Sequence, residues 1–367
     1  MIEKLRKTNE ELRSGIIKAI PYGIPQLNVP GVVPGLLSCI TAATNVGKTP
    51  LAKYIWVFKP IEFAIEHKLD LKILYFALEE NHDEFYWSLY SYLCYKHFGA
   101  RYNINEFEGL YNKPISEDFL KQAEAHNIDE LARQYMGYIH LYDTTYTTQS
   151  IMQQIMTHAH EDGVFYDSKG HSMSLTELFS AGPMGFQDYI VNNKDSFRLA
   201  IVDHISLLTP TNKQKDLRQA IGVFVDDYAR KILAKRLSYF VGVVHQQVSY
   251  GEDVTYKKGK SLEPTKDKLA DNKTVGRTYL EIISLFDPKV YESEDKKSYK
   301  GYTIRELSPF FRILSVLKAR RNSKDNYLPM YFDGKVGHMQ ALPYYKDTDK
   351  MNSIINQITQ YKLQKDG

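Results

Sequence analysis

Hydrophobic residues along the chain fall into short continuous runs, and amphipathic stretches separate these runs. The runs, each of strand length, end at residue 42 or cover residues 71–80, 138–143, 197–204, 239–247, 280–286 and 311–318. Helical periodicity begins at 51–56 and covers 83–97, 151–160 and 217–237. Apolar strands that alternate with helices are typical of a parallel sheet covered on both faces. The pattern therefore predicts an α/β fold with a mostly parallel central sheet.

The same pattern divides the chain into three parts. Residues 1–18 read as an amphipathic helix, residues 19–345 as the domain that contains the sheet, and residues 346–367 as a tail with a short amphipathic helix. Two stretches of the domain, about 99–136 and about 162–195, read as insertions. The first helix either docks on a neighbouring subunit or folds back on its own domain. The tail helix either packs on its own domain or recruits a partner protein.

The composition is ordinary for a soluble globular protein, with 367 residues of which 43% are hydrophobic and 25% charged. The net charge of +3 is nearly balanced, so any contact with nucleic acid has to come from local basic patches. The two cysteines, Cys39 and Cys94, exclude a disulfide framework and a zinc ribbon. No apolar run is long enough to cross a bilayer, and no signal-peptide core follows Met1. We therefore expect a cytoplasmic protein without a membrane partner.

A phosphate-binding loop is predicted where the first strand meets its helix. Gly47-Lys48-Thr49 opens that helix in the layout of the P-loop motif G-x-x-x-x-G-K-[ST]. In such a loop, backbone N–H groups bind phosphates, the lysine reaches the β- and γ-phosphates, and the threonine hydroxyl ligates Mg²⁺. The candidate nucleotide-binding residues are Ala42, Thr44, Asn45, Val46, Gly47, Lys48 and Thr49.

Two residues depart from the motif or follow it unusually. Ala42 replaces the first glycine, whose backbone freedom alanine lacks. Pro50 follows the threonine, and the first turn of a helix tolerates proline because it has no N–H bond to lose. The alternative interpretation is a buried strand followed by an ordinary turn.

Polar residues end three further predicted strands. Because ligands of open α/β sheets bind at the carboxyl ends of the strands, we expect Glu79, Asp203 and Gln246 beside the loop. Asp203 suits a Walker B carboxylate that holds Mg²⁺ through water. Glu79 is the candidate base for water, and Gln246 is the candidate sensor of the γ-phosphate. Each residue alone also suits a turn, a helix N-cap or an edge-facing polar group, but their order along the chain favours the nucleotide site.

With these motifs the chain resembles the hexameric replicative helicases of the DnaB type and their phage relatives, which share a RecA-like P-loop NTPase core. The segment Tyr-Phe-Ala-Leu-Glu-Glu at 75–80 looks like the family's Ser-Leu-Glu-Met segment, which places the catalytic glutamate at Glu79. Asp203-His-Ile-Ser206 is similar to the Walker B segment of the phage branch, and Val243-Val-His-Gln246 stands where the family has its Ser-Gln pair. The resemblance covers roughly residues 15–345 and implies ATP and Mg²⁺ as cofactors.

One late segment matters for assembly. Lys318-Ala-Arg320-Arg321-Asn322 resembles the family's Lys-x-Arg-Asn segment, which supplies a lysine sensor and an arginine finger to the ATP of the neighbouring subunit. Spacing favours Arg320 over Arg321 as the finger. A finger that acts in trans stabilises charge on the transferring phosphoryl group and makes hydrolysis depend on the subunit interface. The alternative is a solvated basic end of a strand.

Two basic segments are candidates for contact with DNA, since the matching loop of RecA-like rings faces the central channel and binds single-strand phosphates. They supply Lys213, Lys215, Arg218, Lys257, Lys258, Lys260, Lys268 and Lys273. The alternative is a pair of solvated loops. The family's Arg-x-Ser-Gly is here Ala270-Asp-Asn-Lys273, so the detailed phosphate contacts differ.

The resemblance implies an ATP-driven replicative DNA helicase that translocates on single-stranded DNA as a hexamer, in the host cytoplasm if a phage encodes it. A primase, a loader or another replisome protein is the implied partner. Two alternatives share the nucleotide chemistry: a RecA-type strand-exchange recombinase, and a replication scaffold or loader that switches with ATP without translocating.

Overall fold

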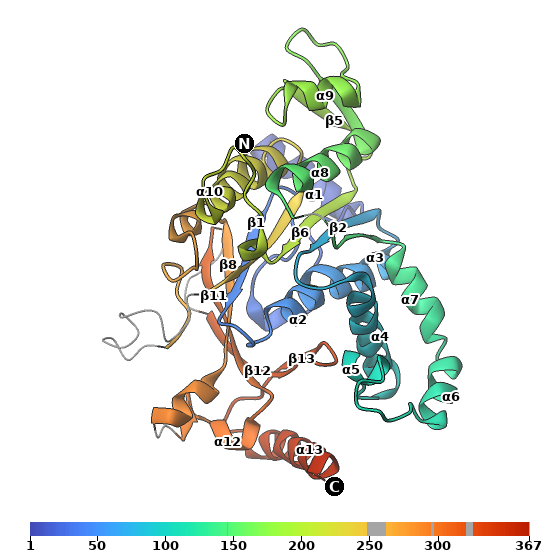
Figure 1. Cartoon of the computed structure of the whole chain (residues 1–367), viewed down its shortest axis with the longest axis vertical. Coiled ribbons are helices and arrows are strands. Elements are labelled where there is room, and N and C mark those ends of the chain that lie inside the picture. The colour runs from blue at the N-terminus through green and yellow to red at the C-terminus, as the bar shows by residue number, and fades with distance from the viewer. Residues whose placement is uncertain (145, 248–261, 295–296, 321–325, 367) are drawn as a thin grey trace.

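The computed structural model describes residues 1–144, 146–247, 262–294, 297–320 and 326–366. In this part of the chain, nine strands form one sheet (Figure 1). In sheet order they are β13 (His338–Ala341), β12 (Asn326–Asp333), β11 (Phe311–Ala319), β8 (Glu281–Phe286), β1 (Leu37–Ala42), β7 (Phe240–Gln246), β6 (Phe197–Asp203), β2 (Leu71–Ala77) and β3 (Ile139–Tyr142). The strands from β8 to β3 are parallel, whereas β11, β12 and β13 are added antiparallel. The predicted mostly parallel sheet is confirmed.

Helices cover both faces of the sheet, because successive side chains of each strand point to opposite faces. Along β1, Ile40 enters one hydrophobic cluster and Cys39 enters the other. The first cluster lies under α2 (Lys48–Lys53), η2 (Tyr54–Phe58), α3 (Lys59–His67), α4 (His82–Phe98) and α7 (Ile128–Met136). The second lies under α8 (Thr148–Asp162), α10 (Leu217–Gly222) and η4 (Val223–Ala234). Burial on both faces explains why the parallel strands are continuously apolar.

The two expected insertions have structure of their own. Residues 99–136 contain α5 (Ile104–Phe107), α6 (Glu117–Ala125) and α7, and these pack beside α4. Residues 162–195 contain the antiparallel hairpin of β4 (Gly163–Tyr166) and β5 (Asp188–Val191), with α9 (Leu175–Ala181) between the two strands. Figure 1 shows this hairpin and α9 projecting from the end of the molecule where α8 lies.

A third hydrophobic cluster fixes the C-terminal tail to its own domain. It gathers side chains from β11, β12, α12 (Ile304–Leu307) and α13 (Thr348–Asp366), beside the short strands β9 (Ser298–Tyr299) and β10 (Tyr302–Thr303). Ile354 and Ile358 of α13 are buried there. The tail is therefore an integral helix of the domain, which agrees with the expectation that it packs on its own domain.

The N-terminal helix α1 (Ile2–Arg13) has no buried residue. Its hydrophobic Ile2 and Leu5 are 69% and 60% exposed. The interpretation that this helix folds back on its own domain is therefore wrong, because such packing would cover its apolar side chains. Short 3₁₀ turns complete the described chain at η1 (Pro25–Leu27), η3 (Ile205–Leu207), η5 (Lys273–Arg277) and η6 (Pro288–Glu294). Among the described residues, no helix combines the length and the apolar character needed to span a bilayer.

Candidate nucleotide-binding site

The predicted phosphate-binding loop joins the buried strand β1 to α2 at the centre of the sheet. Two residues of the loop have left-handed backbone, Asn45 with φ of 61° and Gly47 with φ of 112°. Ala42 is the last residue of β1 and pairs with Gln246, so its backbone is extended and needs no glycine. Pro50 lies in the first turn of α2, where its missing N–H costs nothing. The departures from the motif therefore do not disturb the loop.

Lys48 and Thr49 are the first two residues of α2. The Lys48 side chain is buried, and its Nζ donates a hydrogen bond of 3.3 Å to the carbonyl oxygen of Ala43. Burial lowers the pKa of Lys48, while the nearby carboxylates of Asp203 and Glu79 act in the opposite direction. A buried ammonium group with a single carbonyl partner can still donate to an anion bound by the loop.

The Walker B candidate Asp203 lies at the end of β6, one strand beyond β7, the neighbour of β1. Thr49 Oγ1 donates a hydrogen bond of 3.1 Å to Asp203 Oδ1, and Tyr75 Oη donates one of 2.8 Å to Oδ2. Burial raises the pKa of Asp203, and these two hydrogen bonds partly offset the rise. A hydroxyl and a carboxylate side by side are the hard oxygen ligands that Mg²⁺ takes, directly or through water. Thr49 and Asp203 therefore fit a magnesium site.

Two adjacent glutamates at the end of β2 have different surroundings. Glu80 forms a salt bridge of 2.6 Å with Lys53, and both side chains are almost fully covered. Glu79 is 61% exposed and lies 3.5 Å from Nε2 of His204. Burial raises the pKa of Glu80 and lowers that of His204. Glu80 is thus held by the fold, and Glu79 is the carboxylate that remains accessible beside the loop.

Side chains at the end of β7 connect the P-loop to the segment that follows β7. Gln246 Nε2 donates a hydrogen bond of 2.8 Å to the Thr44 hydroxyl. The next residue, Gln247, donates from its side chain to Thr41 Oγ1 over 3.0 Å and to the Thr265 carbonyl over 3.1 Å. Gln246 therefore links β7 to the P-loop, and Gln247 links β1 to the segment around Thr265.

Sequence reasoning missed two residues that contact the loop from the antiparallel strands. Arg312 Nε donates a hydrogen bond of 3.0 Å to the carbonyl oxygen of Val46, and its guanidinium forms a salt bridge of 3.1 Å with Asp287. The Phe332 ring lies against Gly47, since a Cβ atom on this glycine would lie 2.7 Å from it. These residues line a cavity of about 490 Å³ beside the loop. No local motif signals either residue, because their position depends on how β11 and β12 join the sheet.

The predicted trans-acting residues lie at the opposite edge of the sheet. Ala319 pairs with Glu281, which in turn pairs with Ser38 near the start of β1, so Arg320 stands at the end of the sheet away from the loop. The Arg320 side chain is exposed. Lys318 Nζ instead donates hydrogen bonds of 3.1 and 2.7 Å to the carbonyl oxygens of Gly276 and Arg277. Arg321 lies outside the described residues.

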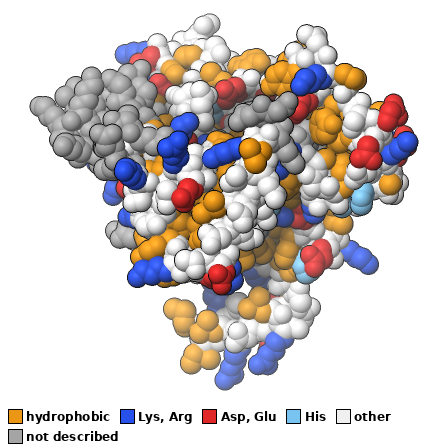
Figure 2. Space-filling view, turned by 90° about the horizontal axis from the view of Figure 1, so that it is seen from below, with side chains coloured by type: hydrophobic (Ala, Val, Ile, Leu, Met, Phe, Trp, Pro, Cys, Tyr) orange, Lys and Arg blue, Asp and Glu red, His pale blue; other side chains and the backbone are white. Residues whose placement is uncertain are grey.

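Some of the predicted DNA-binding residues are described and lie on the surface. Lys213, Lys215 and Arg218 are at least partly exposed, and so is Lys268. Asn272 Nδ2 donates a hydrogen bond of 2.9 Å to the Arg218 carbonyl, so the segments after β6 and β7 lie side by side. Lys257, Lys258 and Lys260, together with the side chain of Lys273, lie outside the described residues. On the face in Figure 2, which is seen from the end that carries α13, basic and acidic side chains are interspersed without a continuous basic stripe.

Comparison with known proteins bears on the fold. No family model matches the sequence, and no curated protein matches it. A solved structure of a DnaB-like replicative helicase, described with its interactions with primase, is similar with a TM-score of 0.61 and 15% identity over 92% of this chain and 66% of the other. A second solved structure, which is described as an ATPase domain, is similar with a TM-score of 0.62 and 15% identity, over 93% of this chain and 98% of that one.

These likenesses define the class of fold. The chain has the α/β architecture of RecA-like ATPase domains, with a large and mostly parallel sheet. It spans just under two thirds of the length of the helicase chain and nearly all of the second structure, the ATPase domain.

Proposed function

We propose that the protein is an ATP-dependent DNA helicase that translocates on single-stranded DNA and unwinds duplex DNA as a hexameric ring. The observation that carries this proposal is the meeting of Thr49, Asp203, Glu79 and Gln246 around one P-loop, with Arg320 at the other edge of the same sheet. A site divided in this way between two edges needs two copies of the chain to be complete.

Each residue has a role that its geometry supports. Lys48 and the N-terminus of α2 bind the β- and γ-phosphates of ATP. Thr49, together with Asp203 through water, would hold Mg²⁺, and the ion would neutralise charge on these phosphates. Glu79 accepts a proton from the attacking water, and Gln246 reports the state of the γ-phosphate through its hydrogen bond to Thr44. Arg320 of one copy stabilises the charge that develops on the nucleotide of the next.

The DNA contact follows from the position of the basic segments. The segments after β6 and β7 start at the edge of the sheet that carries the P-loop, and the hydrogen bond between Asn272 and Arg218 holds them together. Lys213, Lys215 and Arg218 reach the surface there and bind backbone phosphates, together with Lys257, Lys258, Lys260, Lys268 and Lys273. A primase, a loader or another replisome protein is the proposed partner, in line with the helicase of similar fold that interacts with primase.

Strand displacement tests the proposal directly. The substrate is a forked DNA duplex with a labelled strand, and the protein is assayed with ATP and with a non-hydrolysable analogue. We expect displacement with ATP alone, and loss of both displacement and ATPase activity in Lys48→Ala. Strand exchange by helical filaments would favour the recombinase instead. Slow ATP hydrolysis without any displacement would favour the scaffold or loader.

A further inference from the structure

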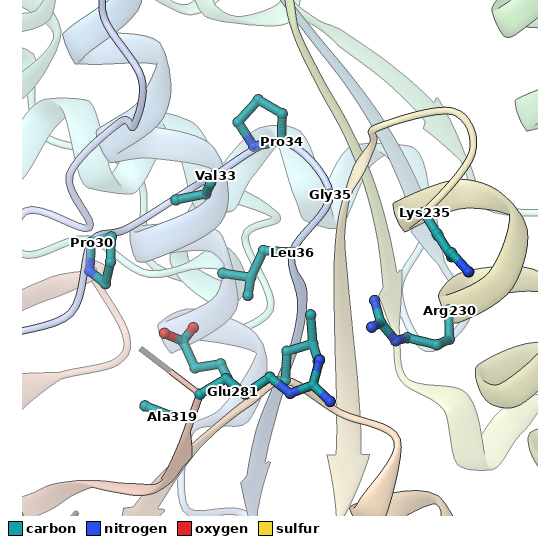
Figure 3. A pocket seen from close by; sticks show the side chains of 11 residues that line it. Pro30, Val33, Pro34, Gly35, Leu36, Arg230, Lys235, Glu281 and Ala319 are labelled. Atoms are coloured by element: carbon teal, nitrogen blue, oxygen red, sulfur yellow. The ribbon is translucent and has the colours of Figure 1, made fainter. Parts of the chain in front are cut away.

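A second cavity lies at the edge of the sheet opposite the P-loop. It has a volume of about 330 Å³ and opens where β1 and β8 begin and β11 ends. Figure 3 shows its walls: the loop from Pro34 to Leu36 on one side, and the end of η4 with Arg230 and Lys235 on the other. Arg320 at the end of β11 lines the same cavity.

The charges around this cavity are mainly positive. Arg230, Lys235 and Arg320 come from two separate elements, and none of them has an ion pair with a described carboxylate within 4.0 Å. Lys231, on the same helix as Arg230, is instead paired with Asp227 at 2.7 Å. Three cations without acid partners among the described residues, around one cavity, form a site for an anion with several charges.

Among the described residues that line the cavity, one is an acid, and it does not neutralise these cations. Glu281 is buried, and its Oε1 accepts hydrogen bonds of 2.6 Å from Tyr22 and 2.7 Å from Ser38. Figure 3 shows its carboxyl group turned toward Pro30 and away from Arg230. Burial also raises the pKa of Glu281, which disfavours its charged form.

The anion cannot be a nucleotide bound to the same chain. From Leu37, level with Arg320, to the start of the P-loop at Ala43 is roughly 20 Å along β1, farther than an arginine side chain extends. A second copy of the chain can bring its own P-loop edge to this cavity. That edge carries Glu79 and Asp203 and would hold the nucleotide phosphates, so its charge is complementary to that of the cavity.

We propose that Arg230 and Lys235, together with Arg320, bind the phosphates of a nucleoside triphosphate held by the P-loop of a second copy of this chain. This inference rests on the proposed function. It adds Arg230 and Lys235 to the residues that act in trans. It also assigns to Arg230 the role of cationic sensor that the sequence suggested for Lys318. The amine of Lys318 is already engaged by the carbonyls of Gly276 and Arg277.

A mixing experiment tests the inference. Lys48→Ala removes the phosphate-binding lysine but keeps the cavity, whereas Arg230→Ala keeps the P-loop but weakens the cavity. We expect Arg230→Ala alone to hydrolyse ATP roughly 10-fold to 100-fold more slowly than wild type, while a fluorescent ATP analogue still binds. An equimolar mixture should recover about a quarter of the wild-type rate, because half of the P-loops and half of the cavities are intact and combine at random.

The control is Lys231→Ala, which removes a neighbouring cation of the same helix outside the cavity and should leave the rate at the wild-type value. Full ATPase activity of Arg230→Ala would overturn this inference but not the proposed function. So would an inactive Arg230→Ala that gains nothing on mixing, since its defect would then act within one chain. An Arg230→Ala protein with weaker DNA binding but a normal DNA-free ATPase rate would also overturn it, in favour of DNA phosphates as the ligand. A wild-type protein without ATPase activity would overturn the proposed function together with the inference.

Discussion

Arg312 and Arg320 lie at opposite ends of the strand β11, roughly 25 Å apart. Arg312 donates a hydrogen bond to the carbonyl of Val46 in the P-loop of its own chain. Arg320 is exposed at the other edge of the sheet, beside the cavity that Arg230 lines. The same strand therefore contacts the candidate nucleotide site at one end and the second cavity at the other.

Substitution of these two arginines should therefore affect nucleotide binding and ATP hydrolysis separately. Arg312→Ala removes a support of the loop and should weaken binding of a fluorescent ATP analogue by roughly tenfold, since one charge-assisted hydrogen bond is lost. Arg320→Ala should bind the analogue like wild type but hydrolyse ATP at least roughly 100-fold more slowly. Binding is measured by fluorescence titration and hydrolysis by phosphate release. Weak binding by Arg320→Ala with normal binding by Arg312→Ala would reverse the two assignments.

The two glutamates after β2 should also differ. Glu79→Gln should keep nucleotide binding and the wild-type free energy of unfolding, and lose hydrolysis by roughly 100-fold or more, because a general base is removed. Glu80→Gln leaves the buried Lys53 without its charged partner and should lower the free energy of unfolding by about 3 kcal/mol. Single-turnover hydrolysis and urea denaturation measure the two effects. An inactive Glu80→Gln of native stability, beside an active Glu79→Gln, would make Glu80 the base.

Gly47 in the P-loop and Ala42 at the end of β1 should respond differently to exchange. Gly47→Ala forces alanine into a φ of 112° and brings its Cβ within 2.7 Å of the Phe332 ring, so nucleotide binding should fall by roughly tenfold or more. Ala42→Gly restores the glycine of the motif, but at the end of a strand. It should not improve binding, and it should lower the free energy of unfolding by about 1 kcal/mol. Tighter binding by Ala42→Gly would contradict this account of the loop.

The buried His245 should make the protein sensitive to acid. The Ala270 carbonyl can only accept a hydrogen bond, so the His245 Nε2 carries the proton at 2.8 Å, and Nδ1 accepts from Tyr279 at 3.3 Å. Burial lowers the pKa of His245 to about 4, below its value in the unfolded chain. Between about pH 6.5 and about pH 4 the unfolded chain binds a proton that the folded chain does not, so stability falls as the pH falls.

Through His245, the free energy of unfolding should fall by roughly 3 kcal/mol over this pH range. His338 contributes in the same direction, because burial lowers its pKa to about 4 as well. Urea denaturation from about pH 7 to about pH 4 measures the slope of the free energy of unfolding against pH. His245→Gln, which can still donate to the Ala270 carbonyl, should have a clearly smaller slope than wild type. Equal slopes for both proteins would show that His245 does not govern the loss of stability.

The parallel part of the sheet was predictable from the sequence because burial on both faces makes each strand a continuous apolar run. β12 was not predicted, since Pro329 interrupts its apolar run and proline usually argues against a strand between two others. Its Pro329 carbonyl nevertheless accepts a bond from Leu342, so the strand is paired on both sides. A pattern of single residues does not reveal pairing of this kind.

The grouping of residues at the candidate nucleotide site was predictable for the same reason as the parallel strands. Thr49, Asp203, Glu79 and Gln246 end or follow such strands, and the ends of parallel strands meet at one edge. Arg312 and Phe332 come from antiparallel strands and reach the loop only through the sheet order. The internal bonds of Lys318 were equally hidden, because they depend on a turn about forty residues earlier in the chain.

We propose that ATP is hydrolysed between copies of the chain, in a motor that works on DNA. The most direct test is the ATPase rate per subunit measured against protein concentration, with and without single-stranded DNA. We expect a rate that rises with protein concentration to a plateau and increases when DNA is added. A rate per subunit that is independent of both protein concentration and DNA would mean that each chain holds a complete site, and would contradict this proposal.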